Sequence, residues 1–317
     1  MLEVRPAGSD VDLGHMVRIV TAVSPEAPVT VEEMRWSDEA YPGGRRFLAW
    51  LDGVAVGAGG AGRVYIYPPE FEGLWGNISV MPEHRRKGVG SALLAAMSNA
   101  AREHGKTMLI GRTTADRPEA IEFLEHRGFR EHERMKIVRL ELDSLDLPPL
   151  EPPDGVVITS LEARPDLVQG VYEVALEALP DIPGDAPEAP GTFEAFRVRD
   201  VDGPSIPPGG FVVGVDASTG RVIGYASLMV APGRPDVAWH HMTGVARDWR
   251  GRGIATALKR ATIAWALANG VGALAGANDT VNAPMRAVNS RLGYQPQPDE
   301  IQFRGPLLGG PLIEADL

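Results

Sequence analysis

Two stretches rich in arginine and glycine carry the clearest chemical signal in this sequence. The first follows an apolar run ending at Val80 and consists of Arg85, Arg86, Lys87, Gly88, Val89, Gly90 and Ser91. The second follows an apolar run ending at Val245 and consists of Arg250, Gly251, Arg252, Gly253, Ile254, Ala255 and Thr256. A glycine-rich turn from a strand into a helix leaves the first helical N–H groups unpaired and partially positive. Each stretch therefore predicts a binding site for a phosphate group.

The spacing of these residues excludes two common phosphate-binding motifs. No Lys-Ser or Lys-Thr pair follows the last small residue, so neither stretch is a P-loop. The G-x-G-x-x-G pattern and its acidic partner are also missing, which argues against a dinucleotide fingerprint. Gly251 and Gly253 would still let the backbone approach a ligand closely, and the N–H groups from Gly251 to Thr256 could converge on a pyrophosphate.

The two stretches belong to a long internal repeat. Arg85 and Arg250, Gly105 and Gly270, and Gly128 and Gly293 are each separated by 165 residues. An offset that persists this far indicates a duplicated domain, and 317 residues suit two domains of about 150 residues each. We predict domains at 1–146 and 154–317, joined by a semi-rigid linker, LPPLEPPD at 147–154, whose prolines cannot donate to a helix or ladder.

Composition narrows the class of protein. The net charge of −11 argues against nucleic-acid binding. The chain has no cysteine, which removes disulfides, thiolate metal sites and a cysteine nucleophile, and we expect no metal site. Its first residues lack the basic and apolar segments of a signal peptide, and no run is long enough to span a membrane, so we expect a cytoplasmic protein.

Periodicity predicts the same mixed α/β order in both halves, with a mostly antiparallel sheet flanked by helices. In the first half we expect strands at 2–5, 47–51, 54–58, 63–67, 74–80, 108–111 and 135–142, helices at 12–23 and 118–127 and after Gly88, and a loop or short broken helices at 25–44. In the second half we expect strands at 156–159, 211–215, 222–230, 239–245 and 273–277, and helices at 167–179, 192–198, 254–268 and 284–292. In each half one strand delivers the arginine- and glycine-rich stretch to the start of a helix.

The second stretch resembles motif A of the GNAT superfamily of acyl-CoA-dependent N-acyltransferases, whose pattern is R/Q-x-x-G-x-G/A. Asn282 and the later Gly293-Tyr294 resemble the Asn…Gly-Phe/Tyr segment of this family. In the first half, Arg117 and the later Gly128-Phe129 form a looser copy of the same segment. The resemblance covers nearly the whole chain as two tandem units. In architecture the chain resembles mycothiol synthases, which are tandem members of the family.

The resemblance implies an enzyme that uses acetyl-CoA as its acyl donor and acetylates a primary amine of a small molecule. The amides of Arg86–Ser91 and of Gly251–Thr256 would hold the pyrophosphate of coenzyme A. Arg85 and Arg250, which directly precede these two segments, are included in the predicted binding sites. Backbone groups near Val80 and Val245 would align the pantetheine, and one N–H would polarise the thioester carbonyl. Asn282 and Asn289 are further candidates for cofactor binding. The amine would attack directly in a ternary complex, without a covalent enzyme intermediate.

The candidates for catalysis are His240, His241 and Asn289. The two histidines should point to opposite faces of one strand, and His is the side chain that titrates near neutrality. The tyrosine that often serves as acid in this family is replaced by Leu124 in the first half and by Asn289 in the second. The second half also keeps Asn282, where the first half has Arg117, so the second half is the favoured catalytic unit.

Several alternatives remain open from the sequence. The first half may hold coenzyme A structurally, bind it weakly or act on another amine, and Tyr294 is expected to pack in the core. Asp181, Asp185 and Glu188 lie in the loop that would wall the acceptor site, either attracting a cationic amine or simply facing solvent. Rival functions are acetylation of a cysteinyl amine, as in mycothiol synthases, a non-catalytic acyl-CoA sensor, or a partner-binding scaffold. The oligomeric state is a monomer or a homodimer.

Overall fold

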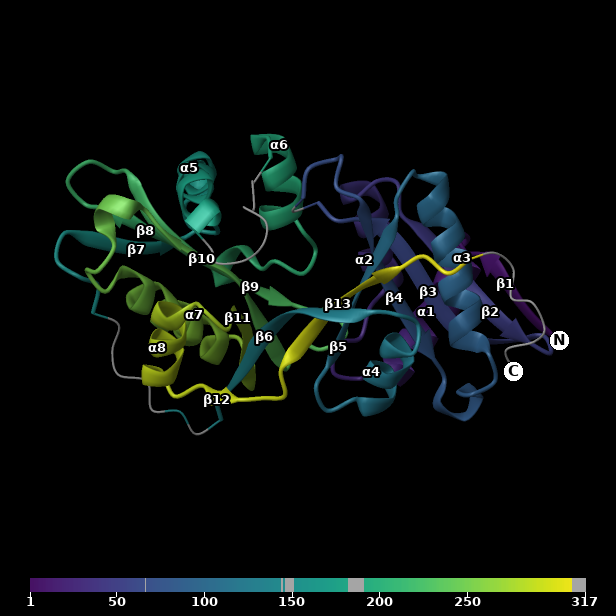
Figure 1. The fold of residues 1–317 in the computed structure, drawn as a ribbon. Coiled ribbons are helices and arrows are strands. Elements are labelled where there is room, and N and C mark those ends of the chain that lie inside the picture. The colour runs from purple at the N-terminus through teal and green to yellow at the C-terminus, as the bar shows by residue number, and fades with distance from the viewer. Residues whose placement is uncertain (66, 144, 146–150, 182–190, 310–317) are drawn as a thin grey trace. The chain divides into compact units, whose positions relative to one another are not determined.

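The computed structural model describes residues 1–65, 67–143, 145, 151–181 and 191–309. The chain divides into two compact units. The first unit is Met1–Arg134 together with Asp299–Leu317, and the second unit is Met135–Pro298. The ribbon in Figure 1 shows a sheet with helices in each of them.

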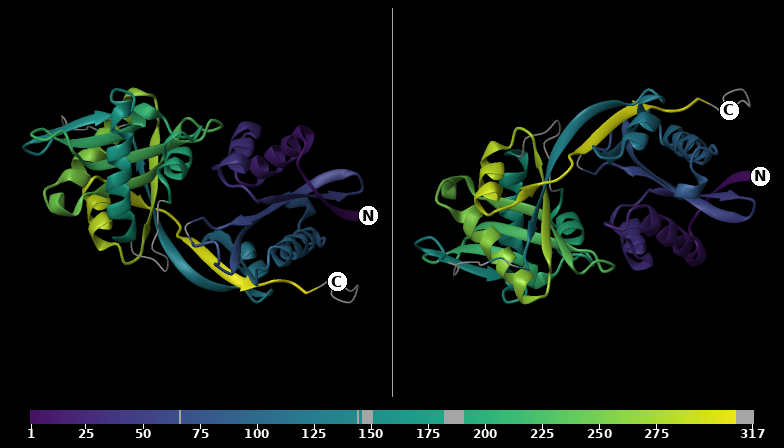
Figure 2. Two further views of the ribbon diagram at one scale, coloured as in Figure 1. Left: turned by 90° about the horizontal axis from the view of Figure 1, so that it is seen from above. Right: turned by 90° about the horizontal axis from the view of Figure 1, so that it is seen from below.

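The first unit is a sheet covered by helices on both faces. Its strands, in spatial order, are β1 (Leu2–Pro6), β2 (Arg45–Leu51), β3 (Val54–Arg63), β4 (Gly73–Val80), β5 (Met108–Thr114) and β13 (Glu300–Pro306). All neighbours are antiparallel except β4 and β5. Helices α1 (Asp10–Val23) and α2 (Val31–Ala40) pack on one face, and α3 (Val89–Glu103) and α4 (Pro118–Glu125) pack on the other (Figure 2).

The second unit repeats this arrangement. Its strands, in spatial order, are β7 (Val156–Ser160), β8 (Phe211–Asp216), β9 (Val222–Val230), β10 (Val237–Val245), β11 (Ala273–Asp279) and β6 (Arg130–Glu141), which also pairs with β12 (Gln295–Pro296). Only β10 and β11 are parallel. Helices α5 (Val168–Ala178) and α6 (Phe193–Phe196) cover one face, while α7 (Ile254–Ala268) packs on the other and α8 (Ala283–Arg291) follows β11.

Helix caps explain where the sequence prediction was incomplete. The segment predicted as a loop or broken helices contains the ten-residue helix α2. Thr30 accepts a hydrogen bond from the backbone of Glu33, and the Glu33 carboxylate accepts one from the backbone of Thr30. This reciprocal capping box stabilises the start of α2 although its residues have little apolar periodicity. The strand expected at 63–67 is not found in its described residues 64, 65 and 67, since β3 ends at Arg63, and residue 66 lies outside the described residues.

The last strand of each repeat lies in the unit formed by the other. Residues 135–141 of β6 pair with β11 in the second unit, with Met135 opposite Asp279. Strand β13 pairs with β5 in the first unit, with Glu300 opposite Thr114. Met135 and Glu300 are separated by the repeat length of 165 residues, as are Thr114 and Asp279, so the exchange is reciprocal and in one register. The sequence predicted the first of these strands and missed β13.

This exchange bears on the domain boundaries. The limits 1–146 and 154–317 remain our prediction for the two copies of the repeat. Each compact unit combines most of one copy with the last strand of the other. Residues 147–150 of the predicted linker fall outside the described residues.

The exchange can be tested with a reciprocal pair of core substitutions. Phe303 is 1% exposed and packs in the core of the first unit, whereas Leu140 is 4% exposed and packs in the core of the second. Phe303→Ala should therefore destabilise the first unit by about 3–5 kcal/mol and Leu140→Ala the second by about 2–5 kcal/mol, because each leaves a cavity. Hydrogen exchange read by mass spectrometry should rise in α3 for the first variant and in α7 for the second. The opposite assignment would contradict the exchange.

Candidate functional site

Each unit contains a pair of parallel strands that separate after a short paired stretch. Strands β10 and β11 pair only where Val237–Trp239 lies opposite Ala273–Ala275. Beyond this stretch, β10 remains paired with β9 and β11 remains paired with β6. Strands β4 and β5 behave in the same way after Trp75 and Ile110. We call each of these places a strand fork. The facing backbone groups beyond the paired stretch are not used in a ladder between the two strands, so they remain available to an extended ligand.

The longer arm of each fork leads into the predicted phosphate loop. In the second unit, a short 3₁₀ helix (Arg247–Trp249) is followed by Gly251 at φ 74° and Gly253 at φ 82°, and α7 begins. In the first unit, the corresponding positions are Arg86 at φ 60° and Gly88 at φ 79°, before α3. Alternating left-handed residues turn successive N–H groups toward one side, forming a concave anion site. The loops thus share one backbone geometry, and Arg86 adopts a conformation that is uncommon for a residue with a side chain.

The structure separates the roles of the predicted loop residues. Val89 and Ile254 are buried in the cores, so only their backbone N–H groups can reach a ligand. Arg85 donates from Nε to the Val80 carbonyl at 3.3 Å, and Arg250 donates to the Val245 carbonyl at 3.0 Å. These two arginines therefore close the loop onto its strand. Both arginines remain exposed, as do Arg86, Lys87, Gly251, Arg252 and Gly253.

Gly90, Ser91, Ala255 and Thr256 form the first turns of the two helices. A Cβ at Gly90 would lie 3.0 Å from the ring of Phe123, so the glycine allows α4 to pack closely against α3. The hydroxyl of Ser91 accepts a hydrogen bond of 2.6 Å from Arg127. Arg127 was not singled out from the sequence; its guanidinium adds positive charge near Arg86, and the pKa of Arg127 is lowered by burial and by that neighbour.

The loop of the second unit has an acidic partner. Asp181 accepts hydrogen bonds from Arg247 at 2.8 Å and from Arg250 at 2.7 Å. These bonds hold the pKa of the Asp181 carboxyl well below its usual range. Asp181 thus pairs with loop arginines, and Asp185 and Glu188 lie outside the described residues. In the first unit, Glu119 pairs with Arg85 at 3.2 Å.

A β-bulge in β10 distinguishes the two forks. Leu228 of β9 lies opposite His240 and Ser227 lies opposite Met242, which leaves His241 as the extra residue. The β3–β4 ladder of the first unit has no such shift. The strand registers therefore place Trp239 at the position of Trp75 and His240 at the position of Gly76. The offset of 165 residues read from the sequence would pair Trp75 with His240 and Gly76 with His241, which is wrong by one residue here because the bulge absorbs an insertion.

The two histidines face opposite sides of the sheet, as predicted. His241 Nε2 lies 3.1 Å from Asp200 Oδ1, on the π-helical turn Arg197–Val201 that follows α6. His240 Nε2 lies 2.5 Å from the hydroxyl of Tyr294, which follows α8. His240 is part-buried, its Nδ1 atom is fully buried without a partner among the described residues, and burial holds the pKa of its imidazole well below 6.5.

Four side chains form a polar cluster between β10, α7 and α8. Its members are His240, Lys259, Asn289 and Tyr294. Lys259 Nζ donates to Asn289 Oδ1 at 2.6 Å and lies 5.3 Å from the centre of the Tyr294 ring. Burial lowers the pKa of Lys259 to about 7 and raises that of Tyr294. Tyr294 is buried, as expected, but it is also hydrogen-bonded. The sequence analysis missed Lys259, although a lysine on the apolar stripe of α7, where the first copy has Leu94, was a visible signal.

Asn282 caps a helix. Its side-chain oxygen accepts a hydrogen bond of 3.2 Å from the backbone of Met285, at the start of α8. At the equivalent position of the first unit, Arg117 bonds to Ser24 and Glu26. That Asn282 contacts the cofactor remains a prediction, while its contribution to the start of α8 is evident.

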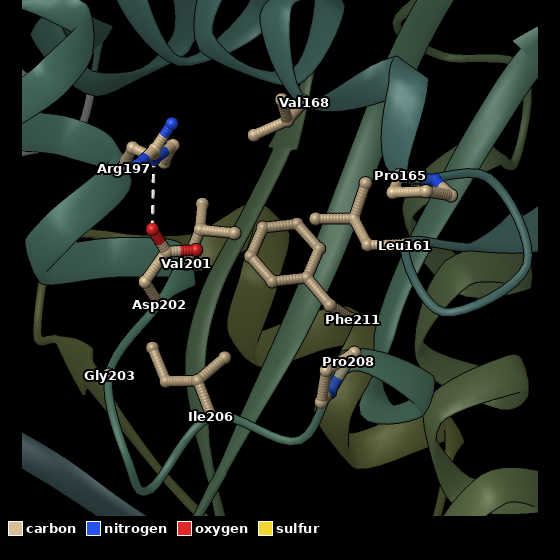
Figure 3. A pocket seen from close by; sticks show the side chains of 10 residues that line it. All are labelled: Leu161, Pro165, Val168, Arg197, Val201, Asp202, Gly203, Ile206, Pro208 and Phe211. Carbon is tan, nitrogen blue, oxygen red and sulfur yellow. Dashed lines mark hydrogen bonds and ion pairs between the residues drawn. The ribbon is translucent and has the colours of Figure 1, made fainter.

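A pocket of about 670 Å³ lies on the α5 face of the second unit. Figure 3 shows its largely apolar lining, formed by Leu161, Pro165, Val168, Arg197, Val201, Asp202, Gly203, Ile206, Pro208 and Phe211. Arg197 and Asp202 pair with each other at 2.9 Å (Figure 3). Phe211 lies opposite Ser227, and Ser227 lies opposite Met242, directly after the bulge. At a strand spacing of about 4.8 Å, the pocket therefore begins about 10 Å from the fork.

Two further kinds of site were sought in the described part of the chain. Within it, no group of three or more His, Cys, Asp or Glu side chains is placed to hold a metal ion. None of the helices described there is both long enough and apolar enough to cross a membrane.

Comparison with curated proteins gives relatives that span most of the chain. A mycothiol acetyltransferase of Actinosynnema mirum is 26% identical over 264 residues, covering 82% of this chain and 84% of that protein. A mycothiol acetyltransferase of Geodermatophilus obscurus is 28% identical over 265 residues, covering 80% of each. These levels of identity support a shared fold and reaction class.

Comparison with solved structures gives tandem neighbours. A tandem GNAT protein from the clavulanic acid biosynthesis pathway is 23% identical, has a TM-score of 0.77, and is matched over 98% of this chain and 100% of that one. A GCN5-related N-acetyltransferase from Sphaerobacter thermophilus is 20% identical, with a TM-score of 0.69 and 98% of both chains covered. These neighbours confirm the predicted fold.

The family itself is matched twice. The acetyltransferase (GNAT) family covers residues 17–129 and again residues 170–294. Each match contains one strand fork, one phosphate loop and the helix that the loop begins. This chain is therefore an acetyltransferase that belongs to the GNAT family and carries the family's domain in tandem.

Proposed function

We propose that the second unit transfers the acetyl group of acetyl-CoA to a primary amine of a small molecule, by direct attack in a ternary complex. The observation that carries this proposal is the bulged His241. It lies on the strand that leads into the phosphate loop and is paired with Asp200, which directly precedes Val201 and Asp202 of the pocket. The first unit has the fork and the loop but lacks the bulge, so we assign it a role in binding coenzyme A rather than in catalysis.

The second unit has groups suited to each part of coenzyme A. The N–H groups from Gly251 to Thr256 would bind the pyrophosphate, helped by the exposed Arg252. The pantetheine would lie along the arm of β10 from Val245 toward His241, using backbone groups that the fork leaves unpaired. The thioester would then reach the bulge, where a backbone N–H can polarise its carbonyl.

The Asp200–His241 pair supports a general-base role for His241. A carboxylate can only accept a hydrogen bond, so the proton of His241 lies on Nε2 and Nδ1 keeps its lone pair. His241 would take a proton from the ammonium of the acceptor, directly or through water. The free amine then attacks the thioester carbonyl, the nitrogen of the tetrahedral intermediate loses a second proton to solvent, and the intermediate collapses by breaking the carbon–sulfur bond. The thiolate leaves and is protonated, so no covalent enzyme intermediate forms.

The pocket supports an acceptor with an apolar body. Its volume is in the range typical of small-molecule sites, and most of its lining is aliphatic or aromatic. Its two charged residues, Arg197 and Asp202, already neutralise each other. An amine carried on a hydrocarbon or aromatic group would bury that group here and direct its nitrogen toward His241.

A second candidate is acetylation of a cysteinyl amine. It is favoured by the mycothiol acetyltransferases at 26–28% identity. The apolar lining of the pocket is less suited to a strongly polar acceptor, because its buried surface offers few hydrogen-bond partners.

Substitution at the two loop glycines tests where the cofactor binds. Gly253→Asp should raise the Kd for coenzyme A in the second unit at least about tenfold, because it brings a carboxylate to the phosphate site. Gly253→Asn has the same shape and tolerates the left-handed conformation, so it should bind nearly normally. The matched pair Gly88→Asp and Gly88→Asn reports on the first unit. Calorimetry gives the stoichiometry of coenzyme A binding for each variant. Turnover should show that only Gly253→Asp abolishes acetyl transfer.

The assignment of His241 as the base predicts a large loss of catalytic activity in His241→Gln. Its kcat/KM for the amine should fall by about 10²- to 10⁴-fold, with coenzyme A affinity unchanged, because proton removal is lost. Asp200→Asn should cause a smaller loss, since it only disturbs the orientation of the imidazole. A His241→Gln variant that keeps the wild-type kcat/KM would rule out His241 as the base.

The shape of the pocket predicts which amines react. With free thiol release as the readout, an arylalkylamine such as phenethylamine should give a higher kcat/KM than glucosamine. Val168→Trp should raise the KM for the better amine by about tenfold without changing that for acetyl-CoA, since it fills the pocket. Val157→Trp, at a site that is 50% exposed on β7, is the control. A preference for a cysteinyl amine would favour the second candidate, and a preference for glucosamine would contradict an acceptor with an apolar body.

A further inference from the structure

The polar cluster begins at the second fork. The last paired residues of β10 and β11 are Trp239 and Ala275, so His240 and Gly276 are the first residues beyond the paired stretch. The ring of His240 lies against Gly276, where an added Cβ would be 3.6 Å away. From His240 the contacts continue to Tyr294, and Lys259 lies against the Tyr294 ring and donates to Asn289. The cluster thus links the mouth of the fork to α7 and α8.

A buried lysine without a carboxylate partner is costly. Lys259 is 3% exposed, and within the described residues no salt bridge reaches it. The groups placed against it are Tyr294, which follows α8, Asn289 on α8, and the neutral His240 on β10, and none of these is an anion near pH 7. A charge in such a place lowers stability unless an anion from outside the chain balances it.

The first unit shows that the fold does not need these polar groups. In its repeat, Leu94 stands at the position of Lys259, Leu124 at that of Asn289 and Phe129 at that of Tyr294. Gly76 stands at the position of His240. All four equivalents are apolar or lack a side chain, and they pack in or beside the core of the first unit. The change from apolar to polar at all four positions indicates a chemical role in the second unit.

We propose that Lys259, through its hydrogen bond to Asn289, positions and polarises the side-chain amide of Asn289, which stabilises the thiolate of coenzyme A as it leaves. The proposal rests on the proposed function, in which the thioester of acetyl-CoA lies at the second fork. Lys259 is a positioning residue, and Asn289 is the group that would touch the sulfur.

The step is electrostatic and involves no proton transfer by the cluster. Lys259 donates to the amide oxygen of Asn289, which leaves both amide N–H groups as donors. When the carbon–sulfur bond breaks, its electron pair stays on sulfur, and these N–H groups stabilise the thiolate. The ammonium strengthens them by withdrawing electron density from the amide oxygen. The thiolate then takes a proton from solvent, and His241 returns the proton of the amine to solvent.

The test compares acetyl-CoA turnover in the full-length protein with that of Lys259→Met, Asn289→Leu and the double variant. Each single variant should lower kcat by about 10- to 100-fold and leave the KM for acetyl-CoA within about twofold, because the interaction forms only as the thiolate develops. The double variant should lose no more than the larger single loss, since both act through one contact. Additive losses, or a wild-type kcat in Lys259→Met, would overturn the proposal.

The pH profile gives a readout that a merely structural lysine would not change. The protonated form of Lys259 is the active one, so the kcat of the wild type should fall as pH rises through its pKa of about 7. This basic limb should be absent in Lys259→Met and should move to higher pH in Lys259→Arg, whose guanidinium stays charged. Thr262→Val removes another buried polar group of α7, whose hydroxyl donates to the Lys259 carbonyl at 2.8 Å, and should leave the limb unchanged.

Stability and ligand absorbance separate the failure of this proposal from that of the proposed function. Between the folded pKa of about 7 and the ordinary 10.5, only the unfolded chain binds the extra proton of Lys259, so stability should rise with pH. This rise should vanish in Lys259→Met, which should fold with an equal or higher Tm. Ultraviolet absorbance should show a lowered thiol pKa for coenzyme A bound to the wild type and a smaller effect in the variant.

A wild type that binds coenzyme A but acetylates no amine would defeat the proposed function. An active wild type whose Lys259→Met variant keeps the same kcat and thiol pKa would defeat this proposal alone.

Discussion

The separation of two parallel strands is the constraint on which the rest of each unit depends. Strands β10 and β11 share only three pairs, and beyond them each strand needs another neighbour for its backbone groups. β9 and β6 supply those neighbours on the outer sides, so the inner sides of the fork stay open. The same strand β10 continues into the loop whose left-handed glycines begin α7. One break in a ladder therefore places strand edges that are not paired with each other and the predicted phosphate loop on one continuous segment.

The two copies retain this framework and differ in the groups added to it. Their loops adopt the same backbone, with Arg86 accepting in the first copy the conformation that Gly251 adopts in the second. The second copy adds a bulge at His241, the partner Asp200 and the cluster around Lys259. Buried polar groups reduce stability unless they are satisfied, and the first copy has apolar residues at the cluster positions. The contrast is what a duplicated enzyme would show if one copy kept the chemistry and the other kept only the binding framework.

The exchange of the last strands makes the stability of each unit depend on both copies. Phe303 and Ile301 come from the end of the second copy and pack in the core of the first unit. Leu140 and Leu142 come from the end of the first copy and pack in the core of the second. Neither copy can therefore complete its own sheet in this structure, and the first unit needs residues 300–306 to form its full core.

The sequence alone determined the repeat, the family, the positions of the phosphate loops and most helices and strands. These follow from local patterns, namely glycines that must adopt positive φ, caps and apolar periodicity. Only the tertiary structure decided features that depend on contacts between distant residues. It showed that β13 completes the first sheet, that His241 is an inserted residue rather than the equivalent of Gly76, and that Lys259 bonds to Asn289 thirty residues away. The reason is that strand register and the burial of a single lysine depend on which partners the fold brings to them, and no local pattern records those partners.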